Sequence, residues 1–556
     1  MNMREYAFPE KDSARRIPMN EIYTASSLEK VLLHKKPRIE RRGSMAKNET
    51  FAFQVVYKYN RFANDIEVEI ESPIKEFITY RQVEYVACST VNLWEGDGFY
   101  LSTIPYACPD ILRPLKNGRA KGRACEYSTL WFTVKGNLPS GKHKIKVTLT
   151  APQTEPISCT YTLEVFDFEL KDSELIYTNW FHYDAIANYY KVEMFSKKYN
   201  EIMDSYIKTA VSHGMNMLLI PMFTPPLDTR VGGERKTAQL IDVYKNGGEY
   251  SFSFDRLIEF MNHVESLGIK HFEMSHLFTQ WGAKAAPKII ASVDGRKKRI
   301  FGWDTPSTSA EYSEFLSCLL PALRERLISE NLYSRCRFHL SDEPWGEVIE
   351  SYRAVHSLFK KYMPDAPVTD ALSHYEYYKE GLVDVPVCTI KSIEPFLESK
   401  AENLFAYYCC AESGDMYPNR YMAYTSLRNR VIGIMLYINK ISGFLHWGYN
   451  FYNTVLSDEA IDPYMVNDGA GGFQSGDAFI VYPGECGALD SIRHETFYDG
   501  LQDMRLLYTL EDKIGREATL ELLKKYGFGE GFNTYPHDEK SLIEVRYEAQ
   551  RLIASR

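Results

Sequence analysis

The segment His339-Leu-Ser-Asp-Glu-Pro344 places two adjacent carboxylates, Asp342 and Glu343, where a short apolar run ends. Like charges this close raise the proton affinity of one group, so that one carboxyl can stay protonated near neutral pH. A carboxylic acid beside a carboxylate suits general acid–base cleavage of a glycosidic bond. We expect Pro344 to hold Glu343 extended and to end the strand there. The alternative is an acidic turn that is merely solvated.

Aromatic and hydrogen-bonding side chains follow four other apolar runs, at 176–182, 270–277, 403–409 and 442–447. A pyranose needs an apolar surface against its face and polar groups around its hydroxyls, and tryptophan with flanking amides supplies both. Each of these side chains alone is more often part of a core. Their recurrence at four strand ends favours a sugar-binding pocket.

Signals for other chemistry are weak. His271 and His276 lie five positions apart with no third ligand at zinc spacing, so we predict no metal and no cofactor. The chain has neither a G-x-S-x-G elbow nor a phosphate-binding loop. Basic runs such as 296–299 are short, and the net charge is −9, which argues against nucleic acid as a partner.

The elements that must position these residues begin near residue 175. Helical stripes of apolar residues, for example over 197–211 and 254–267, separate several short apolar runs. We predict a (β/α)8 TIM-like barrel over 173–490; a doubly wound open sheet is the alternative, without a nucleotide-binding motif to support it. Active sites of such barrels lie at the carboxyl ends of the strands, which favours the catalytic interpretation of Asp342 and Glu343. The eight predicted strands are 176–182, 216–222, 270–277, 335–341, 366–371, 385–390, 403–409 and 442–447.

Two further regions flank the predicted barrel. Apolar and polar residues alternate with period two in segments such as 66–70 and 145–149, which predicts an N-terminal antiparallel β-sandwich over 1–172. Residues 491–556 have a mainly helical pattern, and we expect this C-terminal segment to pack on the barrel. Long loops after the second, third and eighth strands are expected to build the active-site face.

Composition restricts the class of protein to which the chain can belong. The 556 residues are 45% hydrophobic and 25% charged, which is typical of globular proteins. No apolar run is long enough to span a membrane, and no signal peptide is recognisable, so we expect a soluble, cytoplasmic protein without a membrane partner. Ten scattered cysteines without a C-x-x-C pair indicate free thiols. The oligomeric state is not predicted.

Several pieces, taken in order, resemble glycoside hydrolase family 123, the β-N-acetylgalactosaminidases, and the uncharacterised proteins that share its catalytic domain. The pieces are Tyr106-Ala-Cys-Pro-Asp-Ile-Leu-Arg-Pro, Ser275-His-Leu-Phe-Thr-Gln-Trp-Gly, Ser341-Asp-Glu-Pro, Gly443-Phe-Leu-His-Trp-Gly, Gly476-Asp with Val481-Tyr-Pro-Gly, Ser491-Ile-Arg-His-Glu and Asp499-Gly-Leu-Gln-Asp. The resemblance implies a sandwich followed by a barrel. It also implies an exo-acting retaining β-N-acetylgalactosaminidase that acts on glycans or glycoconjugates ending in β-linked GalNAc.

The resemblance also implies roles for residues. Glu343 matches the family's acid and base, and Asp342 matches the residue that orients the substrate's 2-acetamido group while that group attacks the anomeric carbon. We expect Trp281 and Trp447 to form the walls of the sugar pocket, Tyr407 to donate to the acetamido oxygen, and His182 and Asn450 to contact hydroxyls. One alternative is a retaining β-glycosidase with Asp370 or Asp184 as nucleophile, and another is a catalytically silent glycan-binding barrel.

Overall fold

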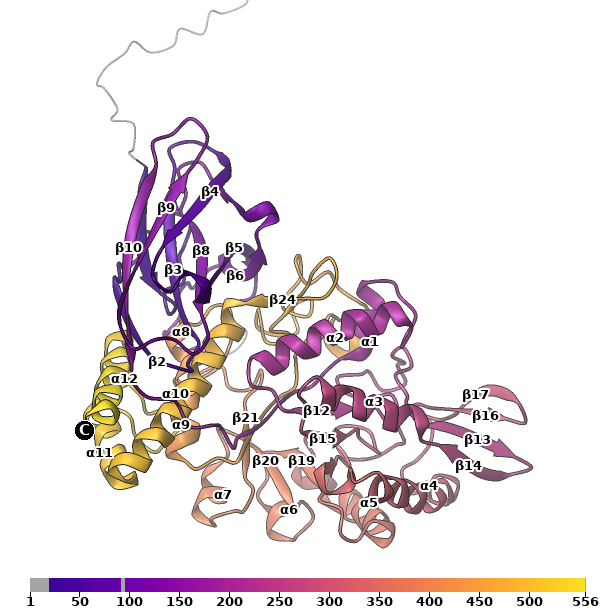
Figure 1. The fold of residues 1–556 in the computed structure, drawn as a ribbon. Coiled ribbons are helices and arrows are strands. Elements are labelled where there is room, and N and C mark those ends of the chain that lie inside the picture. Colours follow the sequence, from indigo (N-terminus) through magenta and orange to yellow (C-terminus); the bar gives the residue numbers. More distant parts are fainter. Residues whose placement is uncertain (1–19, 92–95, 556) are drawn as a thin grey trace, which may run out of the picture.

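A computed structural model describes residues 20–91 and 96–555. A β-sandwich built mainly from described residues between Glu21 and Phe166 stands on a larger part in which strands and helices alternate (Figure 1). The helices of the C-terminal segment lie beside the base of the sandwich. None of the helices in these two ranges is both long and apolar enough to cross a membrane.

The sandwich consists of two facing sheets. Its strands are mostly antiparallel, as predicted, but β2 (Arg42–Ala46) pairs in parallel with β10 (Ile157–Phe166). Because β2 is not joined to β10 by a tight hairpin, no turn fixes the direction of that pair. One sheet has the order β1 (Glu21–Ser26), β3 (Phe51–Lys58), β8 (Ser128–Val134), β5 (Ile78–Cys88), β6 (Tyr106–Pro114), β24 (Ala488–Ser491), β23 (Tyr482–Pro483), and the other has β2, β10, β9 (Gly141–Thr150), β4 (Ala63–Glu71), β7 (Arg119–Gly122).

The period-two pattern has the expected packing consequence. In β9, Ile145, Val147 and Leu149 are buried between the sheets, whereas Lys144 and Lys146 are exposed. The buried residues join those of β3, β8 and β10 in a core of their own. The sandwich therefore holds itself together by its own apolar layer.

The second part contains all eight strands that the apolar runs predict. They form two parallel sheets of five and three strands. The first has the order β11 (Ile176–Asn179), β22 (Gly443–His446), β21 (Phe405–Tyr407), β20 (Val385–Thr389), β19 (Thr369–Leu372), and the second has β12 (Met217–Ile220), β15 (His271–Met274), β18 (Cys336–Phe338).

The two parallel sheets meet at two seams. At one, Phe338 and Val368 form an isolated parallel bridge between the ends of β18 and β19. At the other, the Asn216 amide donates to the Tyr177 carbonyl at 3.1 Å, next to β12 and β11. The ladder that a closed barrel requires is thus interrupted at both seams, and the part as a whole is a mixed α/β structure.

Helices follow the strands and cover them from outside. In α3 (Asp255–Ser266), Leu257, Met261 and Val264 face the core, as their spacing predicts. The loops after β12 and β15 supply a small four-stranded sheet that projects from the body (Figure 1). The other helices of this part are α1 (Tyr183–Tyr189), α2 (Lys197–Ser212), α4 (Ala310–Ser329), α5 (Ile349–Tyr362), α6 (Glu376–Lys379), α7 (Glu394–Glu398), α8 (Ser426–Arg430) and α9 (Ile432–Ile438), and the small sheet consists of β13 (Asp242–Asn246), β14 (Glu249–Ser253), β16 (Ile289–Val293) and β17 (Arg296–Phe301).

After β22 the chain returns to the sandwich before it ends in helices. β24 pairs with β6 and extends that sheet, then leads directly into α10 (Ile492–Ile514). Two further helices, α11 (Arg516–Lys525) and α12 (Glu539–Ala554), complete the C-terminal segment. Parts of the chain far apart in sequence therefore share one sheet.

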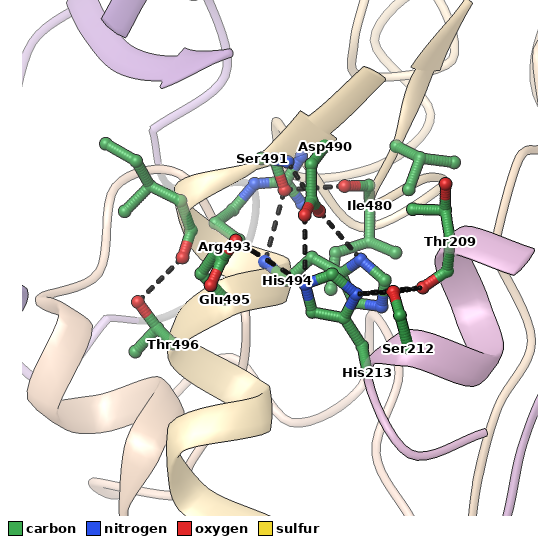
Figure 2. A network of polar contacts seen from close by, with 12 residues as sticks. Thr209, Ser212, His213, Ile480, Asp490, Ser491, Arg493, His494, Glu495 and Thr496 are labelled. Atoms are coloured by element: carbon green, nitrogen blue, oxygen red, sulfur yellow. Dashed lines mark hydrogen bonds and ion pairs between the residues drawn. The ribbon is translucent and has the colours of Figure 1, made fainter. Parts of the chain in front are cut away.

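A buried polar cluster joins α2, β24 and α10 (Figure 2). Asp490 lies between two histidines, 2.9 Å from Nε2 of His213 and 2.8 Å from Nδ1 of His494. Arg81, from β5, binds both Asp490 and Glu495. Burial lowers the pKa of His213, but Asp490 and Glu495 outweigh it and raise that pKa to about 10. The cluster is therefore an ion network between the sandwich and the α/β part.

Candidate active site

A cavity of about 260 Å³ opens where the parallel strands end. It collects side chains from at least six of the eight strand ends. Trp180 follows β11, Trp281 follows β15, Tyr407 ends β21 and Trp447 follows β22. The lining residues are Trp180, Leu227, Asp228, Gln280, Trp281, Asp342, Glu343, Ala371, Tyr407, Cys409, Cys410, Leu445, Trp447, Val455, Leu456 and Phe473.

The backbone turns sharply at the acidic pair. Glu343 has φ 42°, in the left-handed region, so the extended conformation expected before Pro344 is wrong. Trp281 is also left-handed, with φ 59°, and its amide donates to the Asp342 carbonyl at 2.8 Å. Such conformations cost roughly 1–3 kcal/mol each and persist where surrounding contacts hold them. The turn lets two neighbouring carboxylates line the same cavity, which a regular strand does not allow.

The environment of the pair keeps a proton on it. Burial raises the pKa of both carboxyls, and the charge of Glu343 raises the pKa of Asp342 further. Tyr407 donates a 2.6 Å hydrogen bond to Oε1 of Glu343, which opposes the effect of burial there. Two neighbouring carboxyls in one buried cavity do not both ionise easily. The pair therefore keeps one proton at pH values well above the usual pKa range of a carboxylic acid.

A second space of about 360 Å³ adjoins the cavity. Trp281, Glu343 and Tyr407 line both spaces, whereas Asp342 lines the cavity alone. We call this second space the outer groove. Trp345, Lys391 and other polar groups line the outer groove but not the cavity. Glu343 therefore stands at the junction of the two. The other residues of the outer groove are Pro344, Ser373, His374, Thr389, Ser392, Cys409, Cys410, Ala411 and Glu412.

The structure brings five of the seven predicted site residues to the cavity: Asp342, Glu343, Trp281, Trp447 and Tyr407. His182 and Asn450 are buried behind it instead. Oδ1 of Asn450 accepts from the His182 amide at 2.8 Å, and Nε2 of His182 lies 2.9 Å from the Trp447 carbonyl. In this arrangement the two residues support the backbone of Trp447.

The two alternative nucleophiles do not line the cavity. Asp184 is buried against Arg235, whose Nε donates to it at 2.8 Å. Asp370 is fully buried and accepts from the Ser341 amide at 3.2 Å. Its other oxygen lies 3.1 Å from Nδ1 of His339. Both carboxylates are thus already occupied inside the protein.

Three acidic residues near the cavity were not anticipated from the sequence. Burial raises the pKa of Asp228, on the cavity wall, to about 6. Burial likewise raises the pKa of Glu412, in the outer groove, and of Asp477 to about 7 each. Asp477 accepts from the Trp447 indole at 3.2 Å. Asp228 and Asp477 lie in two of the long loops that the sequence singles out, and this is the signal that could have found them.

Two groups in the described ranges have the composition of a metal site. One is His213, Asp490 and His494, and the other is His276, His339 and Asp370. In each group the two imidazole rings are stacked, with centroids 3.9 and 4.5 Å apart and planes within 22° of parallel. The lone pairs of ring nitrogens lie in the ring planes, so stacked rings do not aim them at one point. We therefore assign His213, Asp490 and His494, and the pair of His339 with Asp370, to hydrogen-bonded ion networks, whereas His276 only stacks on His339.

The comparisons with known proteins agree with this geometry. The family described as "Glycoside hydrolase 123, catalytic domain" matches residues 180–510, more than half of the chain. A family 123 glycoside hydrolase from Clostridium perfringens, studied for glycolipid glycan hydrolysis, has a similar structure, with TM-score 0.73 and 13% identity over 97% of both chains. At that identity the likeness shows a shared fold.

Other structures are much less similar. A GH5 xyloglucanase from Bacteroides ovatus has TM-score 0.28 and 8% identity, over 86% of this chain and all of the other. A putative glycoside hydrolase from Bacteroides vulgatus has TM-score 0.29 and 11% identity over 76% of both chains. No protein with a curated description matches. The family match, which includes the strand ends that line the cavity, shows that this chain is a glycoside hydrolase and belongs to family 123.

Proposed function

We propose that this chain is an exo-acting, retaining β-N-acetylgalactosaminidase that uses the substrate's own 2-acetamido group as nucleophile. In this proposal residues 173–490 are the catalytic (β/α)8 barrel, between the sandwich of residues 1–172 and the helical segment of residues 491–556. Its substrate is a glycan or glycoconjugate that ends in β-linked GalNAc. The related Clostridium perfringens enzyme was studied for glycolipid glycan hydrolysis, which is consistent with a substrate of this class.

The observation that carries the proposal is that the two neighbouring carboxyls, Asp342 and Glu343, line different spaces. Glu343 stands where the cavity meets the outer groove, while Asp342 touches the cavity only. A terminal sugar in the cavity places its glycosidic oxygen at the junction, within reach of the acid Glu343. Asp342 then faces the sugar itself, where it can accept from the acetamido N–H and stabilise the positive charge of an oxazolinium intermediate. Glu343 afterwards takes a proton from the incoming water.

Aromatic groups supply the remaining contacts in this proposal. Trp281 and Trp447 offer flat apolar surfaces to the faces of the sugar ring. Phe473 packs against the Trp447 ring with centroids 5.0 Å apart and fixes its orientation. Tyr407, which binds Glu343 in the free protein, is placed to turn its hydroxyl to the acetamido oxygen. Asp228 can accept from sugar hydroxyls on the far wall.

Aryl β-glycosides of GalNAc, GlcNAc, galactose and glucose test the substrate class. We expect hydrolysis of the acetamido sugars, with GalNAc preferred, and no turnover of galactose or glucose. Proton NMR of the first product should show the β-anomer, because formation and opening of the oxazolinium ring each invert the anomeric carbon. An α-anomer appearing first refutes the participation of the acetamido group.

The position of Asp228 on the cavity wall keeps a second mechanism in contention, namely a retaining glycosidase with a protein nucleophile. Here the fluorinated analogue 2-deoxy-2-fluoro-β-galactosyl fluoride separates the two. It traps a covalent ester on a carboxylate nucleophile and should leave the protein mass unchanged if the acetamido group is the nucleophile. A stable adduct on Asp228 establishes the second mechanism.

A further inference from the structure

Two neighbouring thiols stand in the wall of the cavity. Cys409 and Cys410 both line the cavity, and both also line the outer groove. Strand β21 ends at Tyr407, and the chain then turns, with the Glu412 amide donating to the Cys409 carbonyl at 3.3 Å. Consecutive side chains of a regular strand point to opposite faces, whereas this turn brings both cysteines to the same two spaces. The two sulfur atoms are therefore offered together to a molecule that enters the cavity.

Buried groups fix the backbone that carries these thiols. The Cys409 amide donates to Oε2 of Glu412 at 2.7 Å. The Cys409 carbonyl accepts from Nδ2 of Asn419 at 2.9 Å and from the Tyr421 hydroxyl at 2.5 Å. Glu412, Asn419 and Tyr421 are all buried. The site is thus already formed in the free protein, so a ligand that binds both sulfurs loses little free energy in ordering the chain.

The surroundings of this pair differ from those of the other cysteines. All ten cysteines are free, and Cys409 and Cys410 are the only two that are adjacent in the sequence. Both are half-buried in the cavity wall, so their thiols are accessible from the cavity but not from the outer surface at large. The remaining cysteines are single thiols, of which Cys125, Cys318 and Cys486 are exposed and Cys88, Cys108, Cys336 and Cys388 are buried.

The acidic surroundings restrict the chemistry of the first thiol. The Cys410 thiol, burial and the carboxyls of Glu412 and Glu343 together hold the pKa of the Cys409 thiol well above its usual value. Peroxides and alkylating reagents react with the thiolate, so the raised pKa slows their attack. Trivalent arsenic behaves differently, because it exchanges an oxygen ligand for sulfur and the thiol proton leaves in a water molecule. A thiol that stays protonated therefore remains open to arsenic.

We propose that Cys409 and Cys410 form a dithiol site for trivalent arsenic, and that an organic arsenical bound there closes the cavity to substrate. An arsenous acid R–As(OH)2 loses two As–O bonds, the two thiols lose their S–H bonds, and two As–S bonds and two water molecules form. Arsenic stays trivalent, so nothing is oxidised or reduced. The second As–S bond forms within one molecule, and a dithiol therefore holds arsenic far more tightly than a single thiol. The bound group occupies the two spaces that Glu343 and Tyr407 also line.

Phenylarsine oxide, which hydrates to such an acid, tests the proposal on the unaltered protein. With one equivalent, we expect intact-mass measurement to show one phenylarsenic group per chain. Activity on whichever aryl glycoside is cleaved should fall in parallel. The dithiol 2,3-dimercaptopropanol should restore activity, whereas 2-mercaptoethanol at the same thiol concentration should not. Alkylation after denaturation should label every cysteine except Cys409 and Cys410. Arsenic on another cysteine, or full activity with the group bound, overturns the proposal.

Single substitutions separate the dithiol from a lone thiol. Cys409→Ser and Cys410→Ser each leave one sulfur at the site. Compared with its own untreated rate, each variant should need an arsenical concentration about 10²–10⁴ higher for half inhibition. Cys318→Ser is the matched control, because it removes a single exposed thiol on α4 and should respond like the wild type. Wild-type sensitivity in either site variant contradicts the inference. Failure of the glycoside panel on acetamido sugars contradicts the proposed function instead and leaves the mass of the adduct unchanged.

Discussion

At the residue scale, the structure gives different surroundings to two carboxyls that are adjacent in sequence. Glu343 is reached from the cavity and from the outer groove and is bound by Tyr407, whereas Asp342 is reached from the cavity only. Their substitution should therefore have different consequences for different leaving groups. An acid matters in proportion to the basicity of the leaving oxygen, whereas stabilisation of charge on the sugar matters for every substrate.

We expect Glu343→Gln to depend strongly on the leaving group. Hydrolysis of a sugar–sugar bond, whose alcohol leaves poorly, should fall by about 10²–10⁴, the range of general acid–base catalysis. Formation of the intermediate from a nitrophenyl glycoside should fall much less, because that phenolate needs little protonation. Pre-steady-state release of nitrophenol separates this step from hydrolysis of the intermediate.

Asp342→Asn should instead lower the rates on both substrates by similar factors, since both require the acetamido group to be oriented and its positive charge stabilised. The steady-state kcat/KM of the two substrates measures this. Near-wild-type rates on the nitrophenyl glycoside, or the same leaving-group dependence in both variants, transfer the chemistry to another carboxylate. Asp228 on the cavity wall is then the first to replace.

Residue types and spacing were enough to make the acidic pair a candidate that proves to line the cavity, since two carboxylates at a strand end are visible in the sequence itself. They were not enough for Asp228, Glu412 and Asp477, which reach the site from loops whose paths no local pattern specifies. The left-handed turn at Glu343 was also missed, because the usual effect of a following proline is overridden there by tertiary contacts.

At the element scale, the cluster of Figure 2 fixes the end of α2 and the start of α10 to the sandwich. The pKa of His213 is raised to about 10 by its two carboxylates despite burial, and burial together with His213 lowers that of His494 to about 4. A histidine in an unfolded chain titrates near 6.5. The two rings therefore make stability depend on pH in opposite directions.

We expect these two histidines together to stabilise the fold most near pH 6.5. Above it, the contribution of His213 is lost as the pH rises toward 10, because the folded state binds a proton that the unfolded chain no longer holds. Below it, stability falls toward pH 4, because His494 takes up a proton in the unfolded chain but stays neutral in the folded protein, where its pKa is about 4. His213→Gln should reduce the alkaline loss, of which His339, with a pKa of about 9, keeps a part, and should lower stability at pH 6.5 by about 3 kcal/mol or more.

Thermal unfolding of wild type and His213→Gln between pH 5 and 9.5 measures this. His263→Gln is the control, since His263 pairs with Asp204 at 2.7 Å on the surface and is 43% exposed. Parallel stability curves for wild type and His213→Gln contradict the assignment of the buried charge.

Elements were more predictable than their assembly. Each predicted run of the α/β part contains a strand, because short strands buried within a parallel sheet are rich in apolar residues. The seams between the two parallel sheets depend on isolated contacts such as the Phe338–Val368 bridge. Such contacts produce no repeating pattern in the sequence. The same holds for the parallel pairing of β2 with β10, which joins residues more than a hundred positions apart.

At the scale of the whole molecule, two of the motifs that resemble the family, residues 106–114 and 491–495, lie against each other outside the cavity. Asp110, in β6, and Arg493, at the start of α10, form a fully buried ion pair at 2.9 Å. Tyr482 donates to Asp110 at 2.7 Å, and Arg493 also donates to the Phe479 carbonyl at 2.9 Å. These residues connect the sandwich to the α/β part, which the sequence alone could not reveal.

Asp110→Asn should therefore destabilise the whole chain, by about 3–5 kcal/mol, because Arg493 is left buried without a counter-charge. Arg113→Gln, in the same strand, breaks a half-exposed pair with Glu84 and should cost at most about 1 kcal/mol. Denaturant titrations of the two variants compare the costs. An equal and small loss in both indicates that the buried pair does not couple the two parts.

The return of β24 to the sandwich sheet also has a consequence for biosynthesis. On the ribosome, β6 emerges early, but its neighbour β24 is made about 370 residues later, roughly 20–70 s at ordinary rates of elongation. During that interval the backbone groups along this edge have no partner in the sheet, and an unpaired edge is a template for wrong pairing. The nascent sandwich can form its own core early, but this edge stays open until residues 488–491 are made. We therefore expect slow translation near the C-terminus to increase aggregation, and chaperones that bind nascent chains to reduce it.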